Sequence, residues 1–367
     1  MNKLIFSILL IFIFTSAYTN AEVKFVKYKK YLIQVNEPQC NKPKVIVSTD
    51  FGIVPTTSDA NEPQDLTHYL AYSNHFDTRA IVASAEGTAT SLASAISHYQ
   101  FDYQTHFLTS AFGNEFPTPN YLNSILYTGV DEQVNPEPNN SNSSTIKIIN
   151  EATNASPECL LNILVWGPMT DVAAAVHYMT EAQRNNLRIV AIGSSNRSGD
   201  VNAWRYIKKF KDTGGTLFSE NIILMDRGNP TDAFRRLYLG NTCAVNPVLY
   251  NDNGVIGRTE NIMDDLTDKV PTSDRGLRGL LQSTRGNFSS ERLANWQNCQ
   301  TNSRNSANSL RFADSLSTLY LLDSVLGFDG GLRRIIEAND STATGMGNPA
   351  VLRRIYDNFR ARMNDIY

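Results

Sequence analysis

The sequence predicts an α/β fold in which a mostly parallel central sheet is flanked by helices. Short, apolar, β-branched runs alternate along the chain with longer helical stretches. These runs lack the polar–apolar alternation of a sheet with one solvent-exposed face, so helices are expected to cover both faces of the sheet. The chain has 367 residues, 41% of them hydrophobic, which is enough for a sizeable core.

The strands and helices follow one another in a regular order. The strands are expected at residues 45–50, 79–84, 160–166, 187–192 and 220–225. The helices are expected at 66–74, about 91–103, 171–179, 201–210, 309–326 and 349–363. Residues 131–145 are rich in Asn, Ser and Pro and are expected to form a loop, whereas residues 239–305 are polar and weakly periodic and predict an irregular insertion or lid.

The first 21 residues have the pattern of a secretory signal peptide. Lys3 precedes an apolar run at residues 4–14, and residues 19–21 place small side chains at the positions that a signal peptidase reads. The apolar run is shorter than the roughly 20 residues that a membrane span needs. We therefore expect a secreted or periplasmic protein, with residues 22–367 forming a single domain that does not insert into a membrane after signal cleavage.

Composition argues against one class of partner and predicts a covalent cross-link. Lys and Arg total 33 and Asp and Glu 36, a formal net charge of −3 that argues against nucleic-acid binding. The four cysteines, in an exported chain, predict at least one disulfide, although the sequence does not select the pairing. The sequence also leaves open a homo-oligomer.

Acidic residues occur where parallel strands and late helices would bring them together. Asp50 ends the first strand, Asp65 precedes the first helix, and Asp314 lies near the start of a late apolar helix. Each of them alone is more typical of a helix cap. Together they would suit a hard cation with oxygen ligands, and the turn before Thr170 can add a backbone or hydroxyl oxygen.

A polar loop after the strand at 187–192 offers contacts for a sugar or a base. Asn196, Asp200, Asn202 and Trp204 lie in or just after it. The loop is equally well explained as a polar surface loop without a ligand. If the chain has a site, however, these residues are at the strand end where ligands of parallel sheets bind.

The ordered set of motifs resembles the nucleoside hydrolase superfamily. Residues 45–50, the Gly-Pro-Met-Thr-Asp turn at 167–171, and Asp314 match its three marks in order, and residues 61–65 are similar to the nucleoside hydrolase-like domain of bacterial cellulose-binding proteins. The resemblance implies a Rossmann-type, nucleoside hydrolase-like sheet and a Ca²⁺ held by Asp50, Asp65, Thr170 and Asp314. It also implies that Asp50 is the catalytic base for a calcium-bound water.

The sequence departs from the family at two positions that matter for chemistry. Gln64 stands where relatives carry the first of two aspartates, and Ala313 stands where many carry the histidine that protonates the leaving base. His68 and His75 are candidate substitutes for that histidine, and Asp59 is a rival metal ligand.

Two functions follow from these motifs and departures. The first is a secreted, metal-dependent N-glycoside hydrolase acting on a small nucleoside or glycan, with Gln64, Asn196, Asp200, Asn202 and Trp204 binding the substrate. The alternative is a non-catalytic carbohydrate-binding protein on the same fold.

Overall fold

The structure is a computed structural model. It describes residues 24–28, 31–35, 40–52, 62–85, 87–110, 115–129, 143–193, 195–225, 266, 276–283, 314–338 and 349–367. The chain divides into two units, residues 1–41 and 42–367. Within the first, β1 (Lys24–Tyr28) and β2 (Tyr31–Val35) pair as an antiparallel hairpin.

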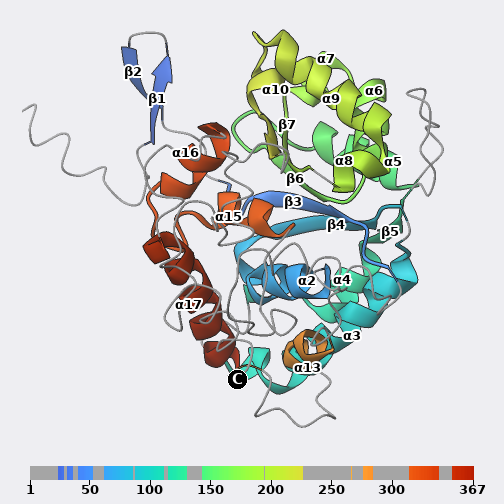
Figure 1. The fold of residues 1–367 in the computed structure, drawn as a ribbon, viewed down its shortest axis with the longest axis vertical. Coiled ribbons are helices and arrows are strands. Elements are labelled where there is room, and N and C mark those ends of the chain that lie inside the picture. Colours follow the sequence, from blue (N-terminus) through green and yellow to red (C-terminus); the bar gives the residue numbers. More distant parts are fainter. Residues whose placement is uncertain are drawn as a thin grey trace, which may run out of the picture. The chain divides into compact units, whose positions relative to one another are not determined.

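A six-stranded sheet forms the centre of the second unit (Figure 1). Its strands are β3 (Lys44–Thr49), β4 (Asp77–Ala83), β5 (Leu126–Thr128), β6 (Leu161–Trp166), β7 (Leu187–Ile192) and β8 (Ile222–Met225). They lie in the order β5-β4-β3-β6-β7-β8, and every neighbouring pair is parallel. The strand order reverses between β3 and β6, and such a switch point is where ligands bind in open parallel sheets.

Helices cover both faces of this sheet. They are α2 (Glu62–Ala71), η1 (Ser73–His75), α3 (Ala89–Thr105), η2 (Phe107–Thr109), α4 (Pro119–Ser124), α5 (Ser143–Thr153), α6 (Thr170–Tyr178), α7 (Glu181–Arg184), α8 (Ser195–Gly199), α9 (Val201–Thr213), α10 (Leu217–Glu220), α13 (Leu277–Gln282), α15 (Leu316–Leu322), α16 (Gly331–Ala338) and α17 (Pro349–Ile366). One apolar core joins the sheet to α2, α3, α15 and α17, and a second joins the opposite face to α5, α6 and α9.

The alternation of the side chains along β3 explains the two cores. Val45 and Val47 face the first core, Ile46 faces the second, and all three are fully buried. A strand covered on both faces needs apolar residues at every position. The predicted parallel α/β fold is confirmed.

Several element boundaries differ from the prediction. Helix α2 starts at Glu62, four residues before the expected position, since a Glu-Pro pair suits the first turn of a helix. Helix α5 begins at Ser143, inside the stretch expected to be a loop, and the three-residue edge strand β5 was not predicted. The expected signal peptide lies outside the described residues, as does the insertion at 239–305 apart from residues 266 and 276–283.

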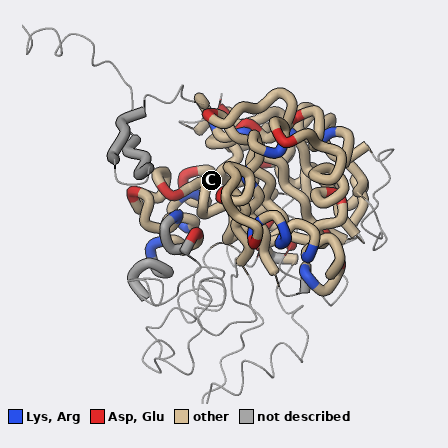
Figure 2. Tube along the Cα trace, turned by 90° about the horizontal axis from the view of Figure 1, so that it is seen from above, with Lys and Arg blue, Asp and Glu red and all other residues tan. Residues whose placement is uncertain are grey.

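The described cysteines test one of the expectations made from the sequence. Cys40 and Cys159 are disulfide-bonded, which confirms the prediction of at least one disulfide, while Cys243 and Cys299 lie outside the described residues. No helix in the described part of the chain is long and apolar enough to cross a membrane. Positive and negative residues are intermixed over the described part (Figure 2).

Candidate metal centre

Three carboxylates converge at the carboxyl edge of the sheet. One oxygen each from Asp50, Glu62 and Asp314 lie within 4.8 Å of one another. Asp50 follows β3, Glu62 is the first residue of α2, and Asp314 lies two residues before α15. Asp50 is half-buried, whereas Glu62 and Asp314 are only 5% and 7% exposed. The cluster is therefore mostly shielded from water.

Asp65 fixes the position of Asp314. Its Oδ2 accepts a hydrogen bond from the Asp314 backbone N–H at 3.0 Å, and its Oδ1 accepts from the backbone N–H and the hydroxyl of Ser315 at 3.0 and 2.5 Å. A carboxylate at the start of a helix satisfies N–H groups that have no partner within the helix. Asp65 thus joins the first turn of α2 to the segment just before α15, and these two segments contribute Glu62 and Asp314 to the cluster.

The end of β6 completes this edge. Trp166, the last residue of β6, donates its indole N–H to the Ser317 hydroxyl of α15 at 2.7 Å. Gly167 follows, and a Cβ at this position would lie 2.8 Å from the Asp50 backbone nitrogen and 3.0 Å from the Asp50 Cβ. Such contacts are too close for a side chain, so only glycine lets β6 approach Asp50 this tightly.

The remaining predicted metal ligand, Thr170, hydrogen-bonds to Asp200. The Thr170 hydroxyl donates to Asp200 Oδ2 at 2.6 Å, while Asp200 Oδ1 accepts from the Ala203 N–H at 2.9 Å and caps α9. The pair therefore ties the start of α6 to the start of α9.

The predicted substrate-binding residues separate into three environments. Asn196 donates its side-chain amide to Asp314 Oδ1 at 3.1 Å and so lies at the carboxylate cluster. Gln64 is fully buried in the first turn of α2, and Trp204 packs in the core under α9. Asn202 is exposed at the start of α9.

The two histidines considered as proton donors are poorly suited to that role. His68 is 1% exposed, its Nδ1 lies 3.0 Å from the Ser315 hydroxyl, and burial lowers its pKa to about 3. The His68 imidazole is therefore neutral near pH 7. His75 has its pKa lowered to about 4, mainly by burial and further by Arg362, and it lies before β4, at the opposite edge of the sheet from the carboxylates. Ala313 and Asp59 lie outside the described residues.

Glu62 is the member of the cluster that sequence reasoning did not propose as a ligand. An acidic residue in the first turn of a helix is ordinarily read as a favourable charge for the helix dipole. The spacing of Glu62 and Asp65 could have indicated it, because residues three apart share one face of a helix and Asp65 was already a candidate ligand.

The donor chemistry fits a hard divalent cation. Three carboxylates held this close repel one another, and a cation among their oxygens would relieve that repulsion. Oxygen-only donor sets of this kind are typical of Ca²⁺ and Mg²⁺. The described residues of the cluster include no sulfur or imidazole donor that would favour Zn²⁺.

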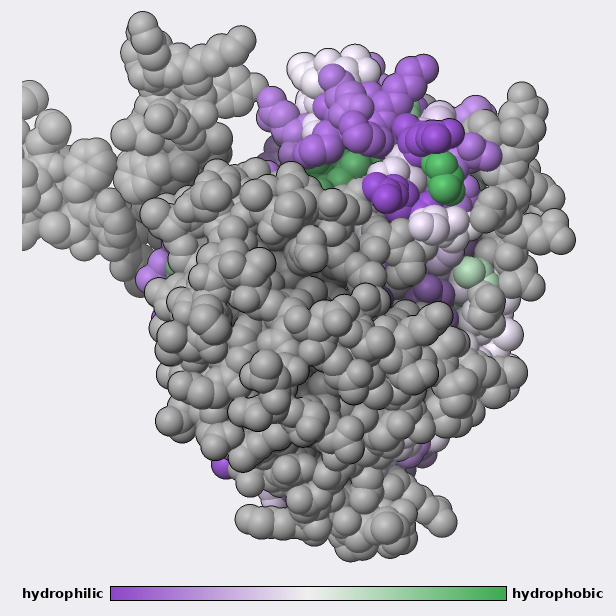
Figure 3. All heavy atoms as spheres, viewed as in Figure 1, coloured by the Kyte–Doolittle hydropathy of each residue, from purple (hydrophilic) through white to green (hydrophobic). Residues whose placement is uncertain are grey.

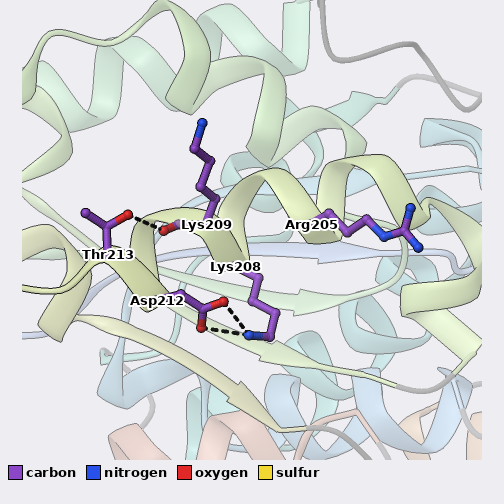
Figure 4. Close-up of a pocket in the computed structure, with 5 residues that line it drawn as sticks. All are labelled: Arg205, Lys208, Lys209, Asp212 and Thr213. Atoms are coloured by element: carbon purple, nitrogen blue, oxygen red, sulfur yellow. Dashed lines mark hydrogen bonds and ion pairs between the residues drawn. The ribbon is translucent and has the colours of Figure 1, made fainter.

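A separate shallow pocket of about 360 Å³ lies on the outer face of α9. It is lined by Arg205, Lys208, Lys209, Asp212 and Thr213, and Lys208 pairs with Asp212 (Figure 4). Hydrophilic residues dominate the surface over α7, α9 and α10 (Figure 3). Because α9 runs back from the carboxyl edge between two parallel strands, its last turns lie toward the opposite edge. The pocket contains none of the candidate site residues.

Comparison with known proteins supports the family resemblance seen in the sequence motifs. Residues 44–211 match the family model described as the nucleoside hydrolase-like domain of the cellulose-binding protein Sde182. These residues are similar to that nucleoside hydrolase-like domain. The predicted resemblance is confirmed, and the matched segment includes Asp50, Glu62 and the Gly167 turn. No curated protein matches the chain.

One solved structure extends the comparison beyond the matched segment. It is a nucleoside hydrolase-related hypothetical protein from Saccharophagus degradans that is associated with carbohydrate metabolism. The TM-score is 0.53 at 16% sequence identity, and the alignment covers 89% of this chain and 72% of that chain. At this identity, the likeness concerns the fold alone. It shows that the nucleoside hydrolase-like fold extends over most of the chain.

Proposed function

We propose that this protein is a metal-dependent N-glycoside hydrolase that binds Ca²⁺ through Asp50, Glu62 and Asp314 and cleaves a nucleoside-like substrate. The observation that carries the proposal is the convergence of these three carboxylates, from three separate elements, at the switch point of a nucleoside hydrolase-like sheet. The N-terminal signal pattern and the disulfide support action outside the cytoplasm.

Each acid has a role that follows from its surroundings. When bound, a divalent cation supplies a water of lowered pKa at neutral pH. Asp50 is the most exposed of the three, so it is the best placed to accept a proton from an attacking water. Glu62 and Asp314, which are buried, stabilise the positive charge that develops on the sugar ring. Asn196 holds Asp314 through its amide.

Neither histidine considered as a proton donor is placed to protonate a leaving base. The buried imidazole of His68 is neutral and His75 lies at the other edge of the sheet, so neither protonates a departing base. The enzyme should therefore favour a substrate such as a p-nitrophenyl riboside, whose leaving group departs as a stable anion, over inosine.

The alternative is a carbohydrate-binding protein that does not turn over substrate. Two observations favour it: the amide of Gln64 replaces an acid, and neither His68 nor His75 is suited to protonate a leaving base. The matching family is itself described as cellulose-binding.

Calcium titration of the mature protein, paired with a hydrolysis assay, tests the proposal. Asp50→Asn, Glu62→Gln and Asp314→Asn each remove one negative charge from the site, so each should weaken Ca²⁺ binding by about tenfold or more. Asp212→Asn on the exposed face of α9 is the matched control and should leave the Ca²⁺ affinity unchanged.

The hydrolysis assay separates the two functions. Calcium-dependent cleavage of the nitrophenyl riboside, lost in Asp50→Asn, is the result expected of the hydrolase. Calcium binding without cleavage of either riboside, together with binding of cellulose oligomers, would support the alternative. Unchanged calcium affinity in all three variants would contradict the metal site itself.

A further inference from the structure

Ser84 is a buried polar residue beside the carboxylate cluster that the proposed chemistry does not use. It directly follows β4, its side chain is fully buried, and its hydroxyl has no hydrogen-bond partner among the described residues. Buried polar groups in folded proteins are nearly always hydrogen-bonded, and an exception calls for an explanation such as an ion, a water or a ligand.

The strand register places Ser84 next to Asp50. Thr49 of β3 pairs with Ala83 of β4 and with Trp166 of β6, and Asp50, Ser84 and Gly167 each come immediately after one of these three residues. The Ser84 backbone N–H also donates to the Thr49 carbonyl at 2.7 Å. The three residues therefore lie side by side at the end of the three central strands.

Gly167 leaves room for the Ser84 hydroxyl in this row. A Cβ on Gly167 would lie 2.5 Å from Ser84 Oγ and 3.0 Å from Asp50 Cβ. The hydroxyl thus occupies the space that a side chain at Gly167 would fill, immediately beside the Asp50 side chain. Any larger residue at position 167 would displace both of them.

We propose that the Ser84 hydroxyl is a further oxygen of the cation site, acting beside Asp50. This inference rests on the proposed function, because it needs a cation at Asp50, Glu62 and Asp314. Ca²⁺ takes six to eight oxygen ligands, more than three carboxylates supply when each gives one oxygen. A neutral hydroxyl adds to the donor set without adding to the repulsion among the acids.

Ser48 provides a matched control within the same sheet. It lies in β3, is fully buried, and its hydroxyl likewise has no hydrogen-bond partner among the described residues. Ser48 differs in lying inside the strand, where it pairs with Val82 and Val165. An effect common to any buried, unbonded hydroxyl would appear equally in both serines.

The experiment measures Ca²⁺ affinity by calorimetry, and thermal unfolding with and without Ca²⁺, for Ser84→Ala, Ser48→Ala and Ser84→Thr. Ser84→Ala should weaken Ca²⁺ binding about tenfold, whereas Ser48→Ala should stay within about twofold of wild type. Without Ca²⁺, Ser84→Ala should unfold at the same or a higher temperature, since removing an unbonded buried hydroxyl is neutral or stabilising. Ser84→Thr keeps the hydroxyl and should recover most of the affinity.

The outcomes separate this inference from the proposed function. Wild type and Ser84→Ala binding Ca²⁺ equally well would overturn the role of Ser84 and leave the carboxylate site standing. An equal loss of affinity in Ser48→Ala would also overturn it, because the effect would then be a general one. Wild-type protein that binds no Ca²⁺ would overturn both the inference and the proposed function.

Discussion

At the scale of single residues, a short hydrogen-bonded chain runs from Asp65, which holds Asp314 of the carboxylate cluster, to the core. Asp65 accepts from the Ser315 hydroxyl, and the same hydroxyl lies 3.0 Å from His68 Nδ1. The His68 ring packs edge-on against Tyr72 and Phe359. His68 therefore positions Ser315 and, through it, Asp65. Because the His68 ring is buried, its protonation would lower the free energy of unfolding.

We predict that His68 makes the protein sensitive to mild acid. Burial lowers the His68 pKa from 6.5 to about 3, so below pH 6.5 the unfolded chain binds a proton that the folded chain does not. The free energy of unfolding therefore falls as the pH drops from 6.5 toward 3, by up to about 1.4 kcal/mol per pH unit. His68→Gln, which cannot titrate, should lose about 2 kcal/mol less than wild type between pH 7.5 and pH 5.

Urea unfolding at the two pH values measures this difference. His177→Gln is the control, since His177 lies exposed at the end of α6. A wild-type protein and a His68→Gln variant that lose equal stability on acidification would show that His68 is protonated in the fold.

At the scale of secondary-structure elements, local patterns predicted the strands better than the helix ends. The apolar runs located β6 to within a residue and β7 without error, because buried parallel strands are apolar throughout. The start of α5 was hidden, since Ser143, Ser144 and Thr145 continue the polar composition of the preceding stretch. The three-residue strand β5 is too short for any periodicity to detect.

The start of α9 yields a prediction about a helix cap. Asp200 caps α9 through the Ala203 N–H and also accepts from the Thr170 hydroxyl, and it is 1% exposed. Asp200→Ala removes the cap and leaves the Thr170 hydroxyl without this acceptor. We expect a loss of about 2 kcal/mol in the free energy of unfolding, measured by urea denaturation.

Asp212→Ala, at the other end of α9, is the control for that variant. Its ion pair with Lys208 is exposed and should contribute less than about 0.5 kcal/mol. A stable Asp200→Ala variant with a raised KM for the riboside would instead make Asp200 a substrate contact, as the sequence pattern had suggested.

At the scale of the whole molecule, the fold could be predicted from the sequence more completely than the site. The alternation of strands and helices determines that strand ends meet at one edge, and this is sufficient to select Asp50 and the Gly167 turn. It does not determine which residues of α2 and of the start of α15 meet Asp50 there. That depends on how both helices pack on the sheet, and the contacts from Asp65 to Asp314 and Ser315 span about 250 positions of sequence.

The packing of α17 against α2 should affect the free energy of unfolding without affecting Ca²⁺ binding at the candidate metal site. Arg362, 7% exposed, donates Nε to the Ala71 carbonyl at 2.9 Å and Nη2 to Asn74 Oδ1, and it lies over the ring of Phe116. Arg362→Met keeps much of the apolar contact but loses both hydrogen bonds, so it should lower the free energy of unfolding by about 2 kcal/mol. Arg362→Lys, which retains a donor, should lose less.

The Arg362→Met variant should bind Ca²⁺ nearly as well as wild type. Ala71 is the last residue of α2 and Glu62 is the first, so the lost contacts lie at the far end of the helix from the carboxylates. We expect the calcium affinity of Arg362→Met to stay within about twofold of wild type. Ca²⁺ should raise the unfolding temperature of both proteins, because a ligand that binds only the folded state stabilises it by an amount that grows with the logarithm of the ligand concentration relative to Kd. Arg205→Met on the exposed face of α9 should alter neither quantity. A large fall in calcium affinity in Arg362→Met would mean that α17 sets the position of the whole of α2, and of Glu62 with it.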